Sequence, residues 1–140
     1  MAIKLAIGLL SLLVSLKLFA AEVAVFVSFS MPETLLAETL KDCARFKIPA
    51  YLNGLYHNSM NETVTKILAL SQKIPKLALQ IDPTAFERFA IKQVPALIVA
   101  KDEVFDVIYG HLSIHEGLLR VSDLGESGLT IEEVRRITDG

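Results

Sequence analysis

The stretch IKQVPALIVA, residues 91–100, places a proline at the start of an otherwise apolar run. Proline cannot donate to a sheet ladder, so within sheets it is confined to edges, bulges and the first residue of a strand. An X–Pro bond costs only about 0.5–1 kcal/mol to hold cis. We therefore expect a buried strand over Ala96–Ala100, introduced by a cis Val94–Pro95 bond.

Strands and helices alternate outward from this proline. The run VFDVIYG, 104–110, follows after the short charged turn KDE, which predicts a β-hairpin. Further apolar, β-prone runs predict strands at 23–29, 50–55 and 77–81, and helical spacing predicts helices at 30–47, 57–73, 82–89 and 113–121. Strands separated by helices pair in parallel, whereas the hairpin is antiparallel. The predicted fold is therefore α/β, a three-layer α/β/α sandwich with a mixed central sheet.

The first residues, MAIKLAIGLLSLLVSLKLFAAE, have the pattern of a secretory signal peptide. Their apolar run, 5–16, is shorter than the roughly 20 residues that span a bilayer. We expect a signal peptide at 1–20 with cleavage after Ala20, which places the rest of the chain outside the cytoplasm. An uncleaved anchor is the alternative.

The remainder divides into one domain and a tail. Residues 21–122 are long enough for one compact domain. Residues 123–140 are polar and punctuated by glycine, and a short helix is expected from Thr130. Inside the domain, the helix at 57–73 carries four apolar residues, Val64, Ile67, Leu68 and Leu70.

Charge and composition exclude several function classes. Of the 14 Lys and Arg, Lys4 and Lys17 leave with the signal peptide, so 12 remain against 16 Asp and Glu, a net charge of −4. No run of Lys and Arg interleaved with aromatic residues appears, so we expect no nucleic acid partner. His111 and His115 have no Asp, Glu or Cys cluster around them that would complete a metal site. We expect no metal, no cofactor, and no membrane contact beyond the signal peptide.

The junction VFVSFSMPE, residues 25–33, runs from the first strand into the first helix, where many oxidoreductases carry reactive cysteines. The chain has one cysteine, Cys43, so no internal disulfide is possible. Ser30 and Glu33 match a capping box, as do Ser59/Glu62, Ser113/Glu116 and Thr130/Glu133. Capping is therefore the predicted role of Ser30.

Several of these stretches resemble known families. Residues 77–121 resemble the second half of a thioredoxin fold, in which the proline is cis and faces the start of the helix after the first strand. More narrowly, the motifs VFVSFSMP, NGLYHNS, IDPTAFERFAIKQVPALIV and FDVIYGHLSI resemble the TrbC pilus-assembly proteins of F-type conjugative transfer systems, across residues 23–122. This resemblance implies a thioredoxin-like fold without CxxC, a periplasmic location, a role in type IV secretion and pilin assembly during plasmid transfer, and TraW as a partner.

The resemblance also implies where a partner would bind. Pro95 would face the helix start, leaving a surface that holds an extended segment of another protein by strand-like hydrogen bonds. Asn53 and Gly54 lie at the strand edge where open α/β sheets usually bind ligands, but a loop with a left-handed glycine is the favoured interpretation of this pair. The predicted groove consists of Ser30, Met31, Pro32, Asn53, Gly54, Val94 and Pro95.

No catalytic residue is expected, and the leading hypothesis is a periplasmic assembly factor that acts by protein binding. The alternative is a thiol-disulfide oxidoreductase or isomerase that uses Cys43. Against it, Cys43 lies on the apolar stripe of its helix, where cysteine behaves as a small buried hydrophobe. A lipid or small-ligand carrier has only the apolar content in its favour.

Overall fold

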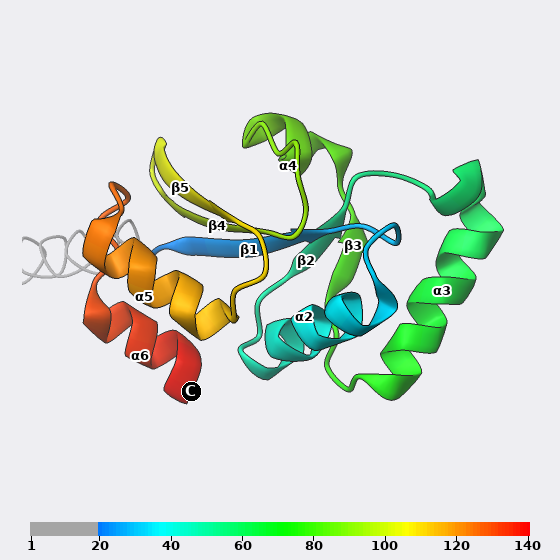
Figure 1. Ribbon diagram of the computed structural model, residues 1–140, viewed down its shortest axis with the longest axis horizontal. Coiled ribbons are helices and arrows are strands. Elements are labelled where there is room, and N and C mark those ends of the chain that lie inside the picture. Colours follow the sequence, from blue (N-terminus) through cyan, green and yellow to red (C-terminus); the bar gives the residue numbers. More distant parts are fainter. Residues whose placement is uncertain (1–19) are drawn as a thin grey trace, which may run out of the picture.

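The computed structural model describes residues 20–140, so the predicted signal peptide lies outside the described residues except for Ala20 (Figure 1). The elements are β1 (Glu22–Val27), α2 (Glu33–Arg45), β2 (Ala50–Leu52), the 3₁₀ turn η2 (Tyr56–Asn58), α3 (Met60–Lys73), β3 (Leu79–Ile81), α4 (Pro83–Arg88), β4 (Ala96–Lys101), β5 (Val104–Tyr109), α5 (Ile114–Leu124) and α6 (Ile131–Asp139). The predicted order of strands and helices is confirmed. In residues 20–140, no helix combines the length and apolar character needed to cross a bilayer.

The five strands form one mixed sheet in the order β3-β2-β1-β4-β5. β1 pairs in parallel with β2 and β2 with β3, whereas β4 is antiparallel to both β1 and β5. In Figure 1, α4 covers one face of the sheet and α2, α5 and α6 cover the other. The predicted α/β/α layering is therefore confirmed.

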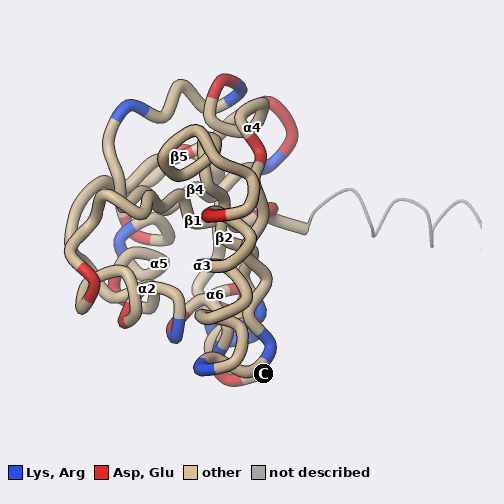
Figure 2. Tube along the Cα trace, turned by 90° about the vertical axis from the view of Figure 1, so that its right-hand side faces the viewer, with Lys and Arg blue, Asp and Glu red and all other residues tan. Residues whose placement is uncertain are grey.

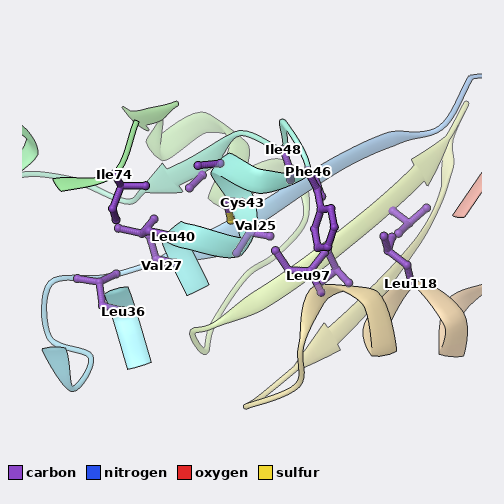
Figure 3. Packing of buried hydrophobic residues seen from close by; sticks show 14 of the residues in the cluster. Val25, Val27, Leu36, Leu40, Cys43, Phe46, Ile48, Ile74, Leu97 and Leu118 are labelled. Atoms are coloured by element: carbon purple, nitrogen blue, oxygen red, sulfur yellow. The ribbon is translucent and has the colours of Figure 1, made fainter. Parts of the chain in front are cut away.

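The core lies on both faces of β1 because successive side chains of a strand point to opposite sides. Val25 and Val27 contribute to the larger hydrophobic cluster, together with Leu40 and Cys43 of α2, as Figure 3 shows. Phe26 is fully buried on the other face and contributes to the smaller cluster beneath α4. A central strand buried on both sides explains the near-continuous apolar run in the sequence.

The apolar residues of α3 are only partly buried. Ile67 and Leu70 pack against the larger cluster, but Val64 is 42% exposed and Leu68 is 58% exposed. Thr63 takes the fully buried position instead. Apolar residues occur around much of this helix, so periodicity alone does not define the face that packs.

The residues predicted as a polar tail pack onto the sheet. α5 continues to Leu124, and Val134 of α6 is buried in the larger cluster. Thr130 and Glu133 form the predicted capping box at the start of α6. Glu133 also forms an ion pair with Lys101 of β4. An ion pair as well as apolar contact therefore holds α6 against the sheet.

Asp106 of β5 anchors the turn between α5 and α6. One carboxylate oxygen accepts the backbone N–H of Glu126 and the other that of Ser127, both at 2.8 Å. Burial raises the pKa of this carboxyl, but the N–H donors outweigh it and hold the pKa below its ordinary value. The ionised form of Asp106 therefore stabilises the connection.

Candidate functional site

The entrance to α2 is a turn and not the predicted capping box. The N–H of Met31 donates to the carbonyl of Ser28 at 3.2 Å, and the helix begins only at Glu33, with Pro32 as N-cap and no side-chain cap. Ser30 instead contacts Ser28, whose hydroxyl lies 2.8 Å from that of Ser30 and accepts its N–H at 3.1 Å. The predicted capping role of Ser30 is wrong because the turn delays the helix, so that Glu33 is its first residue and not its third.

The two residues before the helix cannot supply a thiol. Met31 is only 7% exposed, and its side chain belongs to the larger hydrophobic cluster. Pro32 is exposed. Reactive cysteines use the field of a helix N-terminus to lower their pKa, and at this entrance the positions are occupied by a thioether and an imide ring.

Cys43 lies in the later part of α2, well inside the molecule. It is 1% exposed and packs in the larger cluster. Burial, with a smaller effect from the neighbouring Asp42 carboxylate, raises the pKa of its thiol to about 12. The thiolate, which is the reactive form, is therefore scarce at neutral pH.

An open hollow lies where β1 and β2 end. Its lining residues come from the chain just after β1 and from the loop after β2: Ser28, Phe29, Ser30, Leu52, Asn53, Gly54, Leu55, Tyr56 and His57. The structure thus brings together Ser30, Asn53 and Gly54, three of the predicted groove residues, and all three are exposed. We call this the strand-end hollow.

The loop that follows Gly54 has a constrained backbone. Gly54 does not adopt a left-handed conformation, so the prediction of a left-handed glycine here is wrong. His57 and Asn58 adopt it instead, with φ of 50° and 53°. Left-handed φ is uncommon for residues with a side chain, although Asn and His are enriched there.

Tyr56 forms the wall of the strand-end hollow. Its ring stacks on His57 with centroids 3.7 Å apart, meets the edge of Phe29 at 5.7 Å, and lies 4.5 Å from the ammonium of Lys66. Its N–H donates to the buried hydroxyl of Thr63 at 2.8 Å. The sequence motif NGLYHNS was noted, but no role was predicted for Tyr56. The aromatic residue shortly after a strand could have indicated that role.

The Val94–Pro95 bond is cis, as predicted. Phe26 pairs with Ala96 in the antiparallel register of β1 and β4, so Pro95 lies beside the carboxyl end of β1, at the edge that leads into α2. Its carbonyl accepts the N–H of Gly110 at 3.0 Å. Pro95 therefore occupies the predicted edge of the sheet.

Pro95 lines a different hollow from the one at the strand ends. This second hollow is small, and its lining includes Thr39 of α2 and Gly110 and Leu112 of the segment after β5. Val94 is half-buried and packs against both hydrophobic clusters. Of the seven predicted residues, Ser30, Asn53 and Gly54 line the strand-end hollow and Pro95 lines the second hollow. Met31 and Val94 pack against the core, and Pro32 is exposed between the turn and the helix.

Residues 20–140 contain no group of three His, Cys, Asp or Glu side chains placed to hold a metal ion. The residues that line the strand-end hollow offer hydroxyl, amide, imidazole, aromatic and backbone groups, which can bind by hydrogen bonds and apolar contact.

Three comparisons relate the chain to known proteins. A family model described as "Type-F conjugative transfer system pilin assembly protein" matches residues 25–121. The periplasmic protein TrbC of Escherichia coli (strain K12) is 38% identical over 101 residues, which are 72% of this chain and 48% of that protein. The chain thus spans about half the length of this relative.

A solved structure, titled "Structure of MTB dsbF in its mixed oxidized and reduced forms", superposes with a TM-score of 0.53. The match has 21% sequence identity and covers 76% of this chain and 82% of that chain. A likeness at this identity concerns the fold, and it confirms the predicted thioredoxin-like architecture.

Proposed function

The chain belongs to the family of type-F conjugative transfer pilin assembly proteins, and we propose that it acts in the periplasm by binding other assembly proteins, without redox catalysis. The observation that carries this proposal is the state of its single thiol. Cys43 is 1% exposed and burial raises its pKa to about 12. A thiol in that state is a packing residue.

Thiol–disulfide exchange requires more than one buried sulfur. A thiolate must attack, and a second thiol must resolve the mixed disulfide that forms. The chain has one cysteine, and Met31 and Pro32 stand at the helix entrance where a low-pKa thiol would gain from the helix dipole. These features support a protein that keeps the architecture of a thioredoxin-like domain and uses its surface for binding.

The periplasmic location is supported by two observations. The relative from Escherichia coli is named as a periplasmic protein, and residues 1–20 have the pattern of a signal peptide. Within that compartment, the resemblance of the sequence motifs to TrbC proteins makes TraW the partner that we propose first.

We assign the binding surface to the strand-end hollow and the edge beside it. Among the hydrogen bonds of residues 20–140 that lie outside regular helices and strands, none involves Asn53 or Gly54. Both residues are exposed directly beyond the end of β2, where an extended segment of a partner would find backbone groups available for hydrogen bonds. Ser30 and Tyr56 add a hydroxyl and an aromatic wall for the side chains of that segment.

The proposal is tested by site-specific photocrosslinking in the native cell envelope. A photoreactive residue replaces Asn53 in one variant and Glu87, an exposed residue of α4 on the other face of the sheet, in the control. We expect pilus-assembly proteins, TraW first, to be crosslinked from position 53 and not from position 87. Both results should persist when Cys43→Ala is added.

Two outcomes would contradict the proposal. Equal crosslinking from both positions would remove the strand-end hollow as the binding surface. Recovery of partners only through a disulfide to Cys43, and their loss in Cys43→Ala, would favour the thiol-disulfide oxidoreductase or isomerase.

A further inference from the structure

A second, cationic surface lies where α2 and α3 end. An open hollow there is lined by five basic side chains, those of Lys41, Arg45, Lys47, Lys73 and Lys76, together with Ala44, Ile74, Pro75 and Gly140. Figure 2 shows blue segments gathered near the C-terminus. We call the five basic residues the cationic face. The sequence did not reveal it, because α2 and α3 are separated along the chain and only folding brings their ends together.

No ion pair in the described part of the chain includes a residue of the cationic face. The ion pairs of residues 20–140 join His57 to Glu62, Arg88 to Glu22 and Lys101 to Glu133, and none includes one of the five. All five side chains are exposed, and no acidic side chain lines the hollow. The carboxyl ends of α2, α3 and α6 each contribute about half a negative charge, and together they offset about a third of the five positive charges.

The rest of the domain has the opposite sign. Residues 20–140 contain 12 Lys and Arg and 16 Asp and Glu. The cationic face holds five of those basic residues, so the remaining surface carries seven basic residues against the acidic ones. An extended anionic surface would therefore attract the cationic face and repel the rest of the domain surface. Such a surface would orient the domain as well as bind it.

The composition of the face favours lipid headgroups over a protein partner. Protein interfaces are enriched in arginine and aromatic residues and depleted of lysine. Here four of the five cations are lysines, and no aromatic residue lines the hollow. Lysine presents a compact, hydrated charge without the planar fork that binds a single carboxylate, and clusters of this kind are attracted to anionic membrane surfaces.

We propose that the cationic face of this domain binds the surface of an anionic phospholipid membrane. This replaces the expectation, drawn from the sequence, that the protein has no membrane contact beyond its signal peptide. Each lysine near such a surface strengthens partitioning by about fivefold, equivalent to about 1 kcal/mol. The attraction is electrostatic, so it weakens as salt shortens the Debye length.

The test is flotation of the full chain with two kinds of vesicle, phosphatidylcholine alone and phosphatidylcholine mixed with phosphatidylglycerol. Lys41→Gln/Lys73→Gln removes two charges from the face, and Lys92→Gln/Arg120→Gln removes two exposed charges that do not line it. The apolar N-terminal segment is common to all chains, so its contribution cancels in the comparison. Melting curves establish that both variants remain folded.

We expect the parent chain to prefer anionic vesicles at low salt and to lose the preference at high salt. The variant of the face should lose about 25-fold in partitioning to those vesicles, while the control changes less than about twofold. Equal losses in the two variants would overturn the proposal, because net charge alone would then explain binding. Tighter binding to polyglutamate than to anionic vesicles at the same concentration of negative charge would also overturn it and assign the face to an acidic protein.

Discussion

Native Cys43 should react with thiol reagents far more slowly than the same residue in the unfolded chain. Burial raises its pKa from 9.0 to about 12, so at about pH 8 the thiolate fraction falls from about 9% to about 0.01%, roughly a thousandfold. The nucleophilicity of a thiolate rises with the pKa of its thiol at a Brønsted slope of about 0.4–0.5, so each thiolate that does form reacts roughly 25-fold faster. Ionisation alone therefore slows the reaction by about 40-fold. This is a minimum, because a side chain that is 1% exposed also requires local opening before reagent can reach it.

The assay follows the release of a coloured thiol from an aromatic disulfide reagent, with native chain and with chain in guanidinium. The control is Cys43→Ala/Ser71→Cys, which moves the thiol to an exposed position of α3. The control should react at nearly the unfolded rate, and native Cys43 at least about 40-fold more slowly. If native Cys43 reacts as fast as the control, its thiol is accessible in the folded chain, and the hypothesis of a thiol-disulfide oxidoreductase or isomerase gains support.

Two further predictions concern stability, measured by urea unfolding. Asp106→Asn should cost about 1–3 kcal/mol near neutral pH, because the amide cannot accept both N–H groups that the carboxylate binds. The folded-state pKa of Asp106 is lowered from 3.8, so its contribution is full above the unfolded value and is lost as pH falls through the folded one; a cost that stays constant through that acid range would refute the carboxylate's role. Thr63→Val should cost about 1–3 kcal/mol, since it leaves the N–H of Tyr56 without its acceptor, and a melting curve identical to that of the parent would contradict this reading of the loop.

Local signals in the sequence were enough to predict most of the fold. The proline before an apolar run led to the cis Val94–Pro95 bond and to the hairpin after it. The predicted N-caps at Ser59, Ser113 and Thr130 are confirmed, because each lies directly before its helix and binds the backbone three residues on. Capping and proline motifs of this kind involve residues that are close together in the chain, so they can be recognised from a single sequence.

The misses depend on contacts that are distant in sequence or on competition between local motifs. Ser30 matches the capping pattern as well as Ser59 does, but the turn closed by Met31 and Ser28 takes precedence and delays the helix. In α3, the inward position of Thr63 is set by the loop that its hydroxyl supports. The cationic face was missed because it depends on contacts distant in sequence. Charges spread along the chain form a patch only when the helices that carry them are placed side by side.

The two proposed surfaces lie at opposite ends of the same helix. The turn before α2 contributes Ser30 to the strand-end hollow, and the end of α2 contributes Lys41 and Arg45 to the cationic face. Thirteen residues of helix separate the two regions by about 20 Å. A membrane surface at one end would therefore leave the other end accessible to an assembly partner, so one domain could hold that partner at a fixed distance from the bilayer. The charge variants should accordingly leave crosslinking from Asn53 to isolated partner unchanged, and a loss of both activities in one charge variant would mean that the two surfaces act as a single interface.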